Sequence, residues 1–133
     1  MQIPISKKSL SEPEKLQFRI GRYRTGSIYA GKKHGLEARE YYDLDYYDNM
    51  SYQIIFIVPE DTTSFNSSFF IGLFKDSIKK LGMINFENKY KIILAETNST
   101  IRNKLNADIA DGKRYFENSS LTWLQKLKRI WYY

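Results

Sequence analysis

Asn66-Ser67-Ser68 stands just ahead of a helical pattern and is the stretch best placed for regulated chemistry. The first turn of a helix leaves backbone N–H groups without partners, and the helix dipole favours negative charge there. A phosphate on Ser67 would add a charge of about −1.5 to −2 at that point and change how the surface meets a partner. The structural alternative is that Asn66, Ser67 or Ser64 simply caps the helix.

Most enzymatic chemistries lack the residues that they require. The 133-residue chain contains no Cys and one His, His34. These counts exclude a disulfide scaffold, a thiolate zinc site, a Cys nucleophile and a His-rich metal site. The sequence also has no phosphate-binding loop of the Gly-x-x-x-x-Gly-Lys-Ser/Thr type. We therefore expect a non-enzymatic protein with no catalytic residue, no cofactor and no metal.

Two groups of acidic residues are the remaining candidates for chemistry. Asp43, Asp45 and Asp48 lack the central Gly and the closing Glu of a calcium loop, so we interpret them as a solvated acidic face. Glu60 and Asp61 follow a predicted strand, where α/β folds place ligand sites. No second chemical group stands near them in the sequence, and we assign them no catalytic role.

Charge is distributed unevenly along the chain, whose net charge is +6. Residues 1–34 carry eight Lys or Arg against two Glu, whereas residues 35–61 carry seven acidic residues against one Arg. The first region includes basic residues with tyrosines between them, a composition that can bind a nucleic-acid backbone and stack on bases. The same surface suits an acidic protein partner or solvent. It comprises Arg19, Arg22, Arg24, Lys32 and Lys33, beside His34.

The elements that position these groups alternate between strands and helices. We expect a flexible arm over residues 1–14 and a hairpin of strands 15–20 and 27–30, joined by a Gly-flanked turn. A helix over residues 35–47 follows. Strand 52–58 is a continuous apolar run ended by Pro59, and residues 90–95 form a second buried strand.

Helices are predicted by apolar residues spaced three or four apart. Residues 67–81 form one helix, ended by Gly82, whose Phe70, Phe74 and Ile78 should face the sheet. Another helix, capped by Asn98 or Ser99, carries Ile101, Leu105 and Ile109. The segment 120–133 forms a C-terminal amphipathic helix that packs on the sheet, docks into a partner or lies on a membrane surface.

These elements predict a single α/β domain over residues 1–133. Its mixed sheet should contain about four or more strands with helices packed on it. Strands 52–58 and 90–95 should be parallel neighbours, because a helix connects them in a right-handed crossover.

The segment 54–82 resembles the central part of STAS domains, the anti-sigma-factor antagonists. A buried strand there leads into a loop with a serine motif and then a helix, and this chain has Asn66-Ser67-Ser68-Phe69 at the motif. The resemblance is closer to the STAS-like family of unknown function, with Gly21-Arg22, Gly26, Gly31 and Ser67-Ser68-Phe69-Phe70 as the matching residues. It covers roughly residues 16–110 and implies a STAS-like fold.

The resemblance further implies a regulatory protein that docks on a histidine-kinase-like ATPase or an anti-sigma-like protein, in stress signalling or phage defence. Serine phosphorylation would switch this binding. Asn66 replaces the Asp of the antagonist motif and Phe69 replaces its small residue, so the fold is implied more directly than the phosphorylation. The implied partner-binding and switch residues are Thr62, Thr63, Ser64, Asn66, Ser67 and Ser68.

The alternative function is a small basic nucleic-acid-binding protein, which would use the 19–34 hairpin and the C-terminal helix. Steep weakening of binding with salt would distinguish it from a packed protein interface. The start of the chain has no apolar signal region, and the longest apolar run, residues 54–58, is far shorter than a membrane span of about 20 residues. We therefore expect a cytoplasmic protein.

Overall fold

A computed structural model describes the backbone of residues 12–132 and the side chains of residues 12–117. Most of the predicted arm, 1–14, lies outside the described residues. The side chains of the segment 120–133 lie outside them as well.

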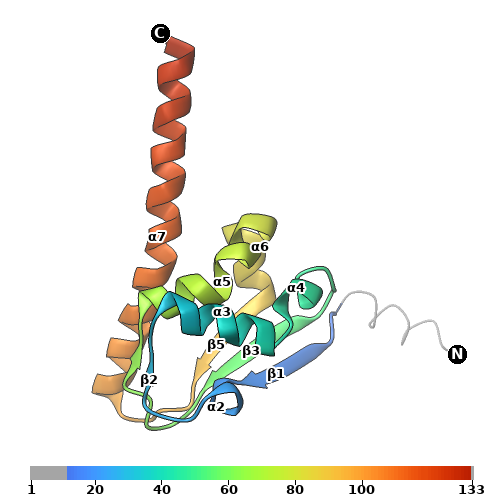
Figure 1. Cartoon of the computed structure of the whole chain (residues 1–133), viewed down its shortest axis with the longest axis vertical. Coiled ribbons are helices and arrows are strands. Elements are labelled where there is room, and N and C mark those ends of the chain that lie inside the picture. The colour runs from blue at the N-terminus through green and yellow to red at the C-terminus, as the bar shows by residue number, and fades with distance from the viewer. Residues whose placement is uncertain (1–11, 133) are drawn as a thin grey trace, which may run out of the picture.

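The described chain is an α/β structure with two small parallel sheets (Figure 1). The larger sheet has the strand order β1-β3-β5, and the smaller sheet pairs β2 with β4. The predicted parallel pairing of the two buried strands is confirmed, because Phe56 lies opposite Ile92 in a parallel register. The prediction of one mixed sheet with about four or more strands is wrong, since every pair is parallel and the larger sheet has three strands. The strands are β1 (Lys15–Arg19), β2 (Ile28–Tyr29), β3 (Gln53–Val58), β4 (Ser64–Phe65) and β5 (Tyr90–Leu94).

The predicted N-terminal hairpin does not form. β1 pairs with β3 and places Phe18 opposite Phe56, while β2 pairs with β4. The residues between β1 and β2 include a short helix, α2 (Ile20–Tyr23), which turns the chain away from the larger sheet. Ile20 in this helix is fully buried, so tertiary packing takes precedence over the local turn signal.

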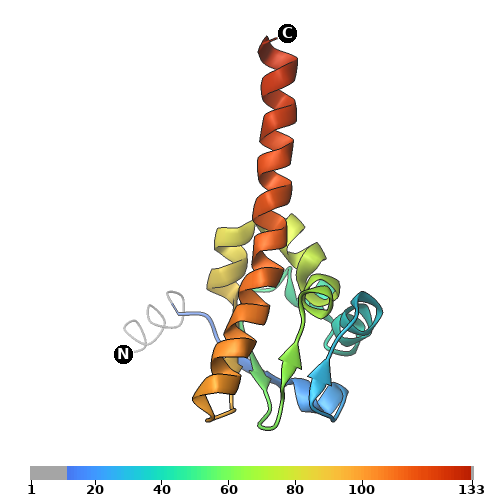
Figure 2. The same cartoon turned by 90° about the vertical axis from the view of Figure 1, so that its left-hand side faces the viewer.

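The remaining helices include one that the sequence analysis missed, α6. The predicted helix over residues 35–47 is two helices, because the left-handed backbone of Asp43, with φ of 55°, separates α3 from α4. The two predicted C-terminal helices are one continuous helix, α7, whose far end extends away from the rest of the molecule (Figures 1 and 2). The helices are α3 (Lys32–Tyr41), α4 (Leu44–Tyr47), α5 (Ser67–Leu81), α6 (Met83–Lys89) and α7 (Ser99–Tyr132).

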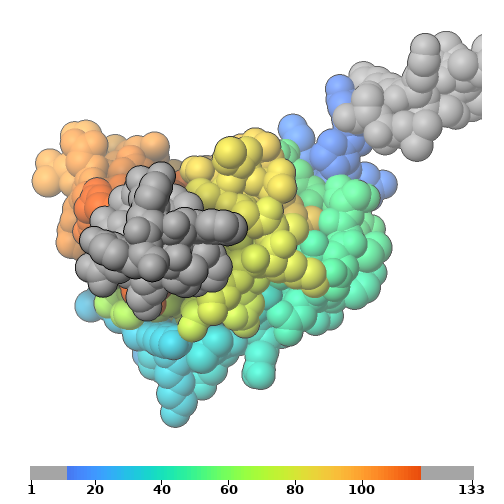
Figure 3. Space-filling model, turned by 90° about the horizontal axis from the view of Figure 1, so that it is seen from above, coloured from blue at the N-terminus to red at the C-terminus, as the bar shows by residue number. Residues whose placement is uncertain are grey.

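The core lies between the larger sheet and the helices packed against it. Phe74 of α5 lies 5.4 Å from Phe56 and 5.6 Å from Tyr90, measured between ring centroids. Phe70, Phe74 and Ile78 are all buried, which confirms the inward face predicted for this helix. Seen from above, α6 lies between α7 and the segment that carries α4 (Figure 3).

Helices α3 and α5 run in the same direction in backbone contact. A Cβ atom on Gly72 would lie 2.2 Å from the carbonyl oxygen of Lys32, and one on Gly35 would lie 2.3 Å from that of Phe69. Real Cβ atoms are not found at such distances, so only glycine permits this approach. The contact sets the start of α3 beside the start of α5.

A buried polar network holds the other ends of the same helices together. Arg39 of α3 donates hydrogen bonds to Asp48 at 2.7 Å, to the hydroxyl of Ser77 at 2.8 Å and to the carbonyl of Leu73 at 3.1 Å. Asp48 also accepts hydrogen bonds from Ser77 and Tyr90. Burial and the bond to Asp48 raise the pKa of Tyr90, so its phenol stays neutral. The interpretation of Asp48 as part of a solvated face is therefore wrong.

Candidate functional site

The loop before α5 is held in place by strand β2. The backbone N–H groups of Thr63 and Ser64 donate to the carbonyl of Ser27, at 2.7 and 3.2 Å. The N–H of Asn66 donates to the carbonyl of Tyr29 at 3.0 Å. These bonds present the end of the loop and the first turn of α5 as one fixed surface.

Asn66 caps α5. It is one of the three residues, with Ser64 and Ser67, that the sequence offered as the cap. Its side-chain oxygen accepts hydrogen bonds from the N–H of Phe69 at 3.0 Å and from the hydroxyl of Ser68 at 2.8 Å. The Ser68 hydroxyl in turn accepts a hydrogen bond from the N–H of Gly31 at 3.2 Å, at the start of α3. Asn66 and Ser68 therefore have structural roles and join the two helix starts.

Ser67 is the first residue of α5, and its side chain differs from those of Asn66 and Ser68 in its hydrogen bonding. Its side chain is half-buried, and its hydroxyl makes no hydrogen bond with any residue whose side chain the structure describes. Because Asn66 already caps the helix, the Ser67 hydroxyl is not needed for that purpose.

The other residues of the predicted surface differ in their access to solvent. Thr62 is fully buried, and its hydroxyl has no hydrogen-bond partner within the described part of the chain. Thr63 is exposed and donates from its hydroxyl to the carbonyl of Ser27 at 3.3 Å. Ser64 is half-buried in β4. Contacts with a partner would therefore involve Thr63 and Ser67 more readily than Thr62.

Basic side chains lie near Ser67, although the carboxylate of Asp108 also reaches this loop and accepts from the N–H of Phe65 at 3.1 Å. The adjacent start of α3 carries Lys32 and Lys33, both exposed. The nearest acidic side chain on this helix, Glu37, is bound to His34 at 3.0 Å. Hydrogen bonds from His34 and Tyr23 lower the pKa of Glu37. Two helix starts and two lysines thus lie together at this end of the molecule.

The predicted basic surface is divided between two places. Arg19 and Arg22 line a hollow of about 390 Å³ together with Gln17, Phe18 and Tyr42, whereas Lys32 and Lys33 lie at the start of α3. Arg24 is exposed at the end of α2. All five basic residues are exposed, but no hairpin presents them as one strip.

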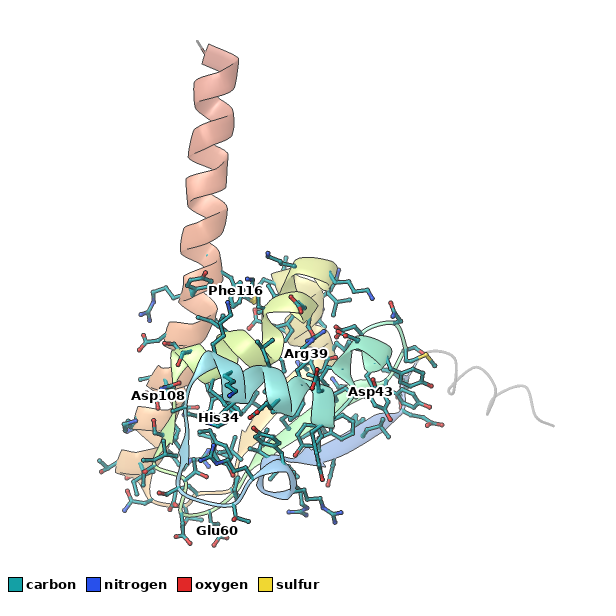
Figure 4. All side chains as sticks on the ribbon, viewed as in Figure 1. His34, Arg39, Asp43, Glu60, Asp108 and Phe116 are labelled. Atoms are coloured by element: carbon teal, nitrogen blue, oxygen red, sulfur yellow. The ribbon has the colours of Figure 1, made fainter. Side chains whose placement is uncertain are left out.

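The acidic residues do not form a metal site in the described part of the chain. Asp45 is exposed but paired with Arg39 at 2.7 Å, and Asp48 is buried in the same network. Glu60 is exposed beyond the end of β3 (Figure 4), and the N–H of Asp61 donates to Glu96 at 2.9 Å. No cluster of three or more His, Cys, Asp or Glu within residues 12–117 is arranged to hold a metal ion.

Sequence reasoning missed a second hollow, of about 340 Å³, beside α4. The repeated tyrosines of residues 41–47 are the sequence signal that could have indicated this hollow. Phe18 belongs to β1, and only the fold brings it next to these tyrosines. The lining residues are Phe18, Tyr41, Tyr42, Asp43, Tyr46 and Tyr47.

Comparison of the chain with protein-family models, curated proteins and solved structures gave no match. The STAS-like resemblance therefore stays a prediction. Within the part of the chain that the structure describes, no helix combines the length and apolar character that crossing a bilayer requires.

Proposed function

We propose that this protein is a non-enzymatic regulatory module that binds a partner protein through the end of the 62–68 loop and the first turn of α5. Ser67 is the switch residue. The observation that carries the proposal is the difference between Ser67 and its neighbours. Asn66 and Ser68 hold the helix starts, while the Ser67 hydroxyl makes no hydrogen bond among the residues whose side chains are described.

The position suits phosphorylation for two physical reasons. The hydrogen bonds of Asn66 and Ser68 do not involve the Ser67 hydroxyl, so we expect them to persist when Ser67 is modified. The starts of α3 and α5, with Lys32 and Lys33, favour an added negative charge. Phosphorylation would therefore alter the surface without unfolding it.

The partner class comes from the STAS resemblance, which implies a histidine-kinase-like ATPase or an anti-sigma-like protein. A neutral Ser67 would lie inside the interface. A phosphate there would bring extra bulk and charge into an interface that fits a neutral hydroxyl, and the partner's side of that interface would have to desolvate this charge at a cost. The unmodified protein is thus the binding form and the phosphorylated protein is the released form.

The experiment has two stages, both with the full chain. A photoreactive amino acid at position 67 captures the partner in cells, and mass spectrometry identifies it. Calorimetry then compares wild type, Ser67→Ala and Ser67→Asp for affinity, beside their melting temperatures. We expect Ser67→Ala to bind like wild type and Ser67→Asp to bind about tenfold more weakly, which is about 1.4 kcal/mol.

Ser99 offers a matched control. It is the first residue of α7 and follows the capping residue Asn98, whose side chain accepts from the N–H of Ile101 at 3.1 Å. Ser99→Asp therefore makes the same local change on another surface and should leave affinity unchanged. Equal affinities for wild type and Ser67→Asp would show that Ser67 is not a switch.

A further inference from the structure

Five aromatic rings form a continuous arc at the end of α3, on a surface separate from the start of α5. In order along the arc they are Tyr41, Tyr42, Phe18, Tyr47 and Tyr46. The distances between neighbouring ring centroids are 4.8, 5.2, 5.3 and 5.0 Å. Three of the four neighbouring pairs are turned by 66–82°, so the rings face in more than one direction.

The inner rings are fixed by the fold and the outer rings are accessible. Tyr42 is buried and donates a hydrogen bond to the carbonyl of Arg19, which holds its ring against Phe18. Tyr41 and Tyr46, at the two ends of the arc, are 56% and 49% exposed. A ligand can therefore reach the hollow without displacing core residues.

Groups that carry negative charge lie near the aromatic hollow. Asp43 is one of the residues that line the hollow, and its left-handed backbone lies between α3 and α4 (Figure 4). The carboxyl end of α3 terminates at Tyr41, and a helix carries partial negative charge at that end. Arg39, the basic residue near this end of α3, is neutralised by Asp45 and Asp48. Arg19 and Arg22 line the adjoining hollow, which shares Phe18 and Tyr42 with this one.

The chain's described cations do not occupy the hollow. In the part with described side chains, the Lys–aromatic contact is that of Lys89 with Tyr90, at 5.8 Å. Neither residue lines the aromatic hollow.

We propose that this aromatic hollow binds an alkylated ammonium cation of the trimethylammonium type. The faces of aromatic rings carry negative potential, and rings grouped around a cation are the usual means by which proteins recognise quaternary ammonium groups. A primary ammonium such as that of lysine is strongly hydrated and gives up its water reluctantly, whereas alkyl groups replace that shell and contact the rings directly. Asp43 supplies the counter-charge.

Choline and its neutral isostere 3,3-dimethylbutan-1-ol provide the decisive comparison, because they share shape and differ in charge. Binding of each to the full-length protein is followed by NMR titration of the tyrosine ring signals. We expect choline to bind at least about tenfold more tightly than the neutral alcohol. Equal binding of the two would show a merely apolar hollow and overturn the proposal.

Matched variants locate the site. Tyr46→Leu and Asp43→Asn should each weaken choline binding about three- to tenfold; Asn tolerates the left-handed backbone at position 43. Tyr115 is 48% exposed on α7, and Asp111 is an exposed carboxylate on the same helix. Tyr115→Leu and Asp111→Asn should therefore leave binding unchanged. Unaltered circular dichroism spectra would show that the variants fold, and equal weakening by the Tyr115 and Tyr46 changes would refute the location.

Comparison of choline with a trimethyllysine compound distinguishes the source of the cation. Choline represents a free or headgroup ammonium, and the amide of N-acetyl-trimethyllysine represents a modified peptide; tighter binding of either supports the site and identifies its source. The amide of N-acetylarginine tests the competing chemistry. Tighter binding of the arginine compound than of both trimethylammonium probes would contradict the proposal.

Discussion

Replacing Asp48 with Asn removes a charge from the centre of the polar network that joins α3 to α5. The Asp48 side chain is 1% exposed and lies 2.7 Å from Arg39. It also accepts hydrogen bonds from Ser77 and Tyr90. An Asn amide preserves the shape but directs an N–H group towards donors, so at least one buried hydrogen bond is lost.

The cost follows from burial. Breaking a buried ion pair by removing one partner costs about 3–5 kcal/mol, because the remaining charge is uncompensated. Arg39 retains Asp45 at 2.7 Å in this variant, and the oxygen of the new amide would still accept some of the hydrogen bonds. We therefore expect Asp48→Asn to lower the free energy of unfolding by about 2–4 kcal/mol.

Asp45 provides the matched control, since it pairs with the same guanidinium. Its side chain is 85% exposed, and exposed ion pairs contribute about 0–1 kcal/mol, so Asp45→Asn should cost no more than that. Urea unfolding followed by far-UV circular dichroism gives both values under one set of conditions. A cost below about 1 kcal/mol for Asp48→Asn, or equal costs for the two variants, would refute the assignment of the network as a buried stabilising element.

Two further predictions concern the aromatic core. Phe74→Ala should cost about 3–5 kcal/mol in urea unfolding, because the fully buried ring contacts Phe56, Phe86 and Tyr90; a cost below about 1 kcal/mol would contradict that packing. Burial raises the pKa of Tyr42 to about 12, from an ordinary value of 10.0. The stability from a neutral Tyr42 is therefore complete below pH 10 and is lost as the pH rises towards 12, by about 2–3 kcal/mol. Urea unfolding at pH 8 and pH 11 should show that the free energy of unfolding falls less between these pH values for Tyr42→Phe than for wild type. Equal decreases would show that ionisation of Tyr42 does not cause the alkaline loss of stability.

The sequence predicted the elements whose signals are local. The apolar run of β3, the spacing of Phe70, Phe74 and Ile78, and the glycine after α5 each depend on neighbours within a few residues. Asn66 is one of three candidates for the cap, and only the structure distinguishes it from Ser67. The distinction matters for the proposed function, because among the described residues it assigns the cap to Asn66 and not to the Ser67 hydroxyl.

Long-range pairing could not be predicted in the same way. Alternation at Leu16 and Phe18 indicates a strand but not its partner, and β1 pairs with β3 more than thirty residues later rather than with β2. Burial of Asp48 depends on Arg39, Ser77 and Tyr90, which come from three other elements. No spacing rule connects such residues.

Helix α3 connects the two proposed surfaces and keeps them apart. Its start lies beside Ser67, and its end supplies Tyr41 to the aromatic hollow. The Gly35–Gly72 contact and the Arg39 network fix this helix against α5 along its length. We expect a ligand in the hollow to leave the start of α3 in place, because a shift of this helix along α5 would disturb both the glycine contact and the buried network. We therefore expect the two proposed surfaces to act independently, so that occupancy of one leaves the other unchanged.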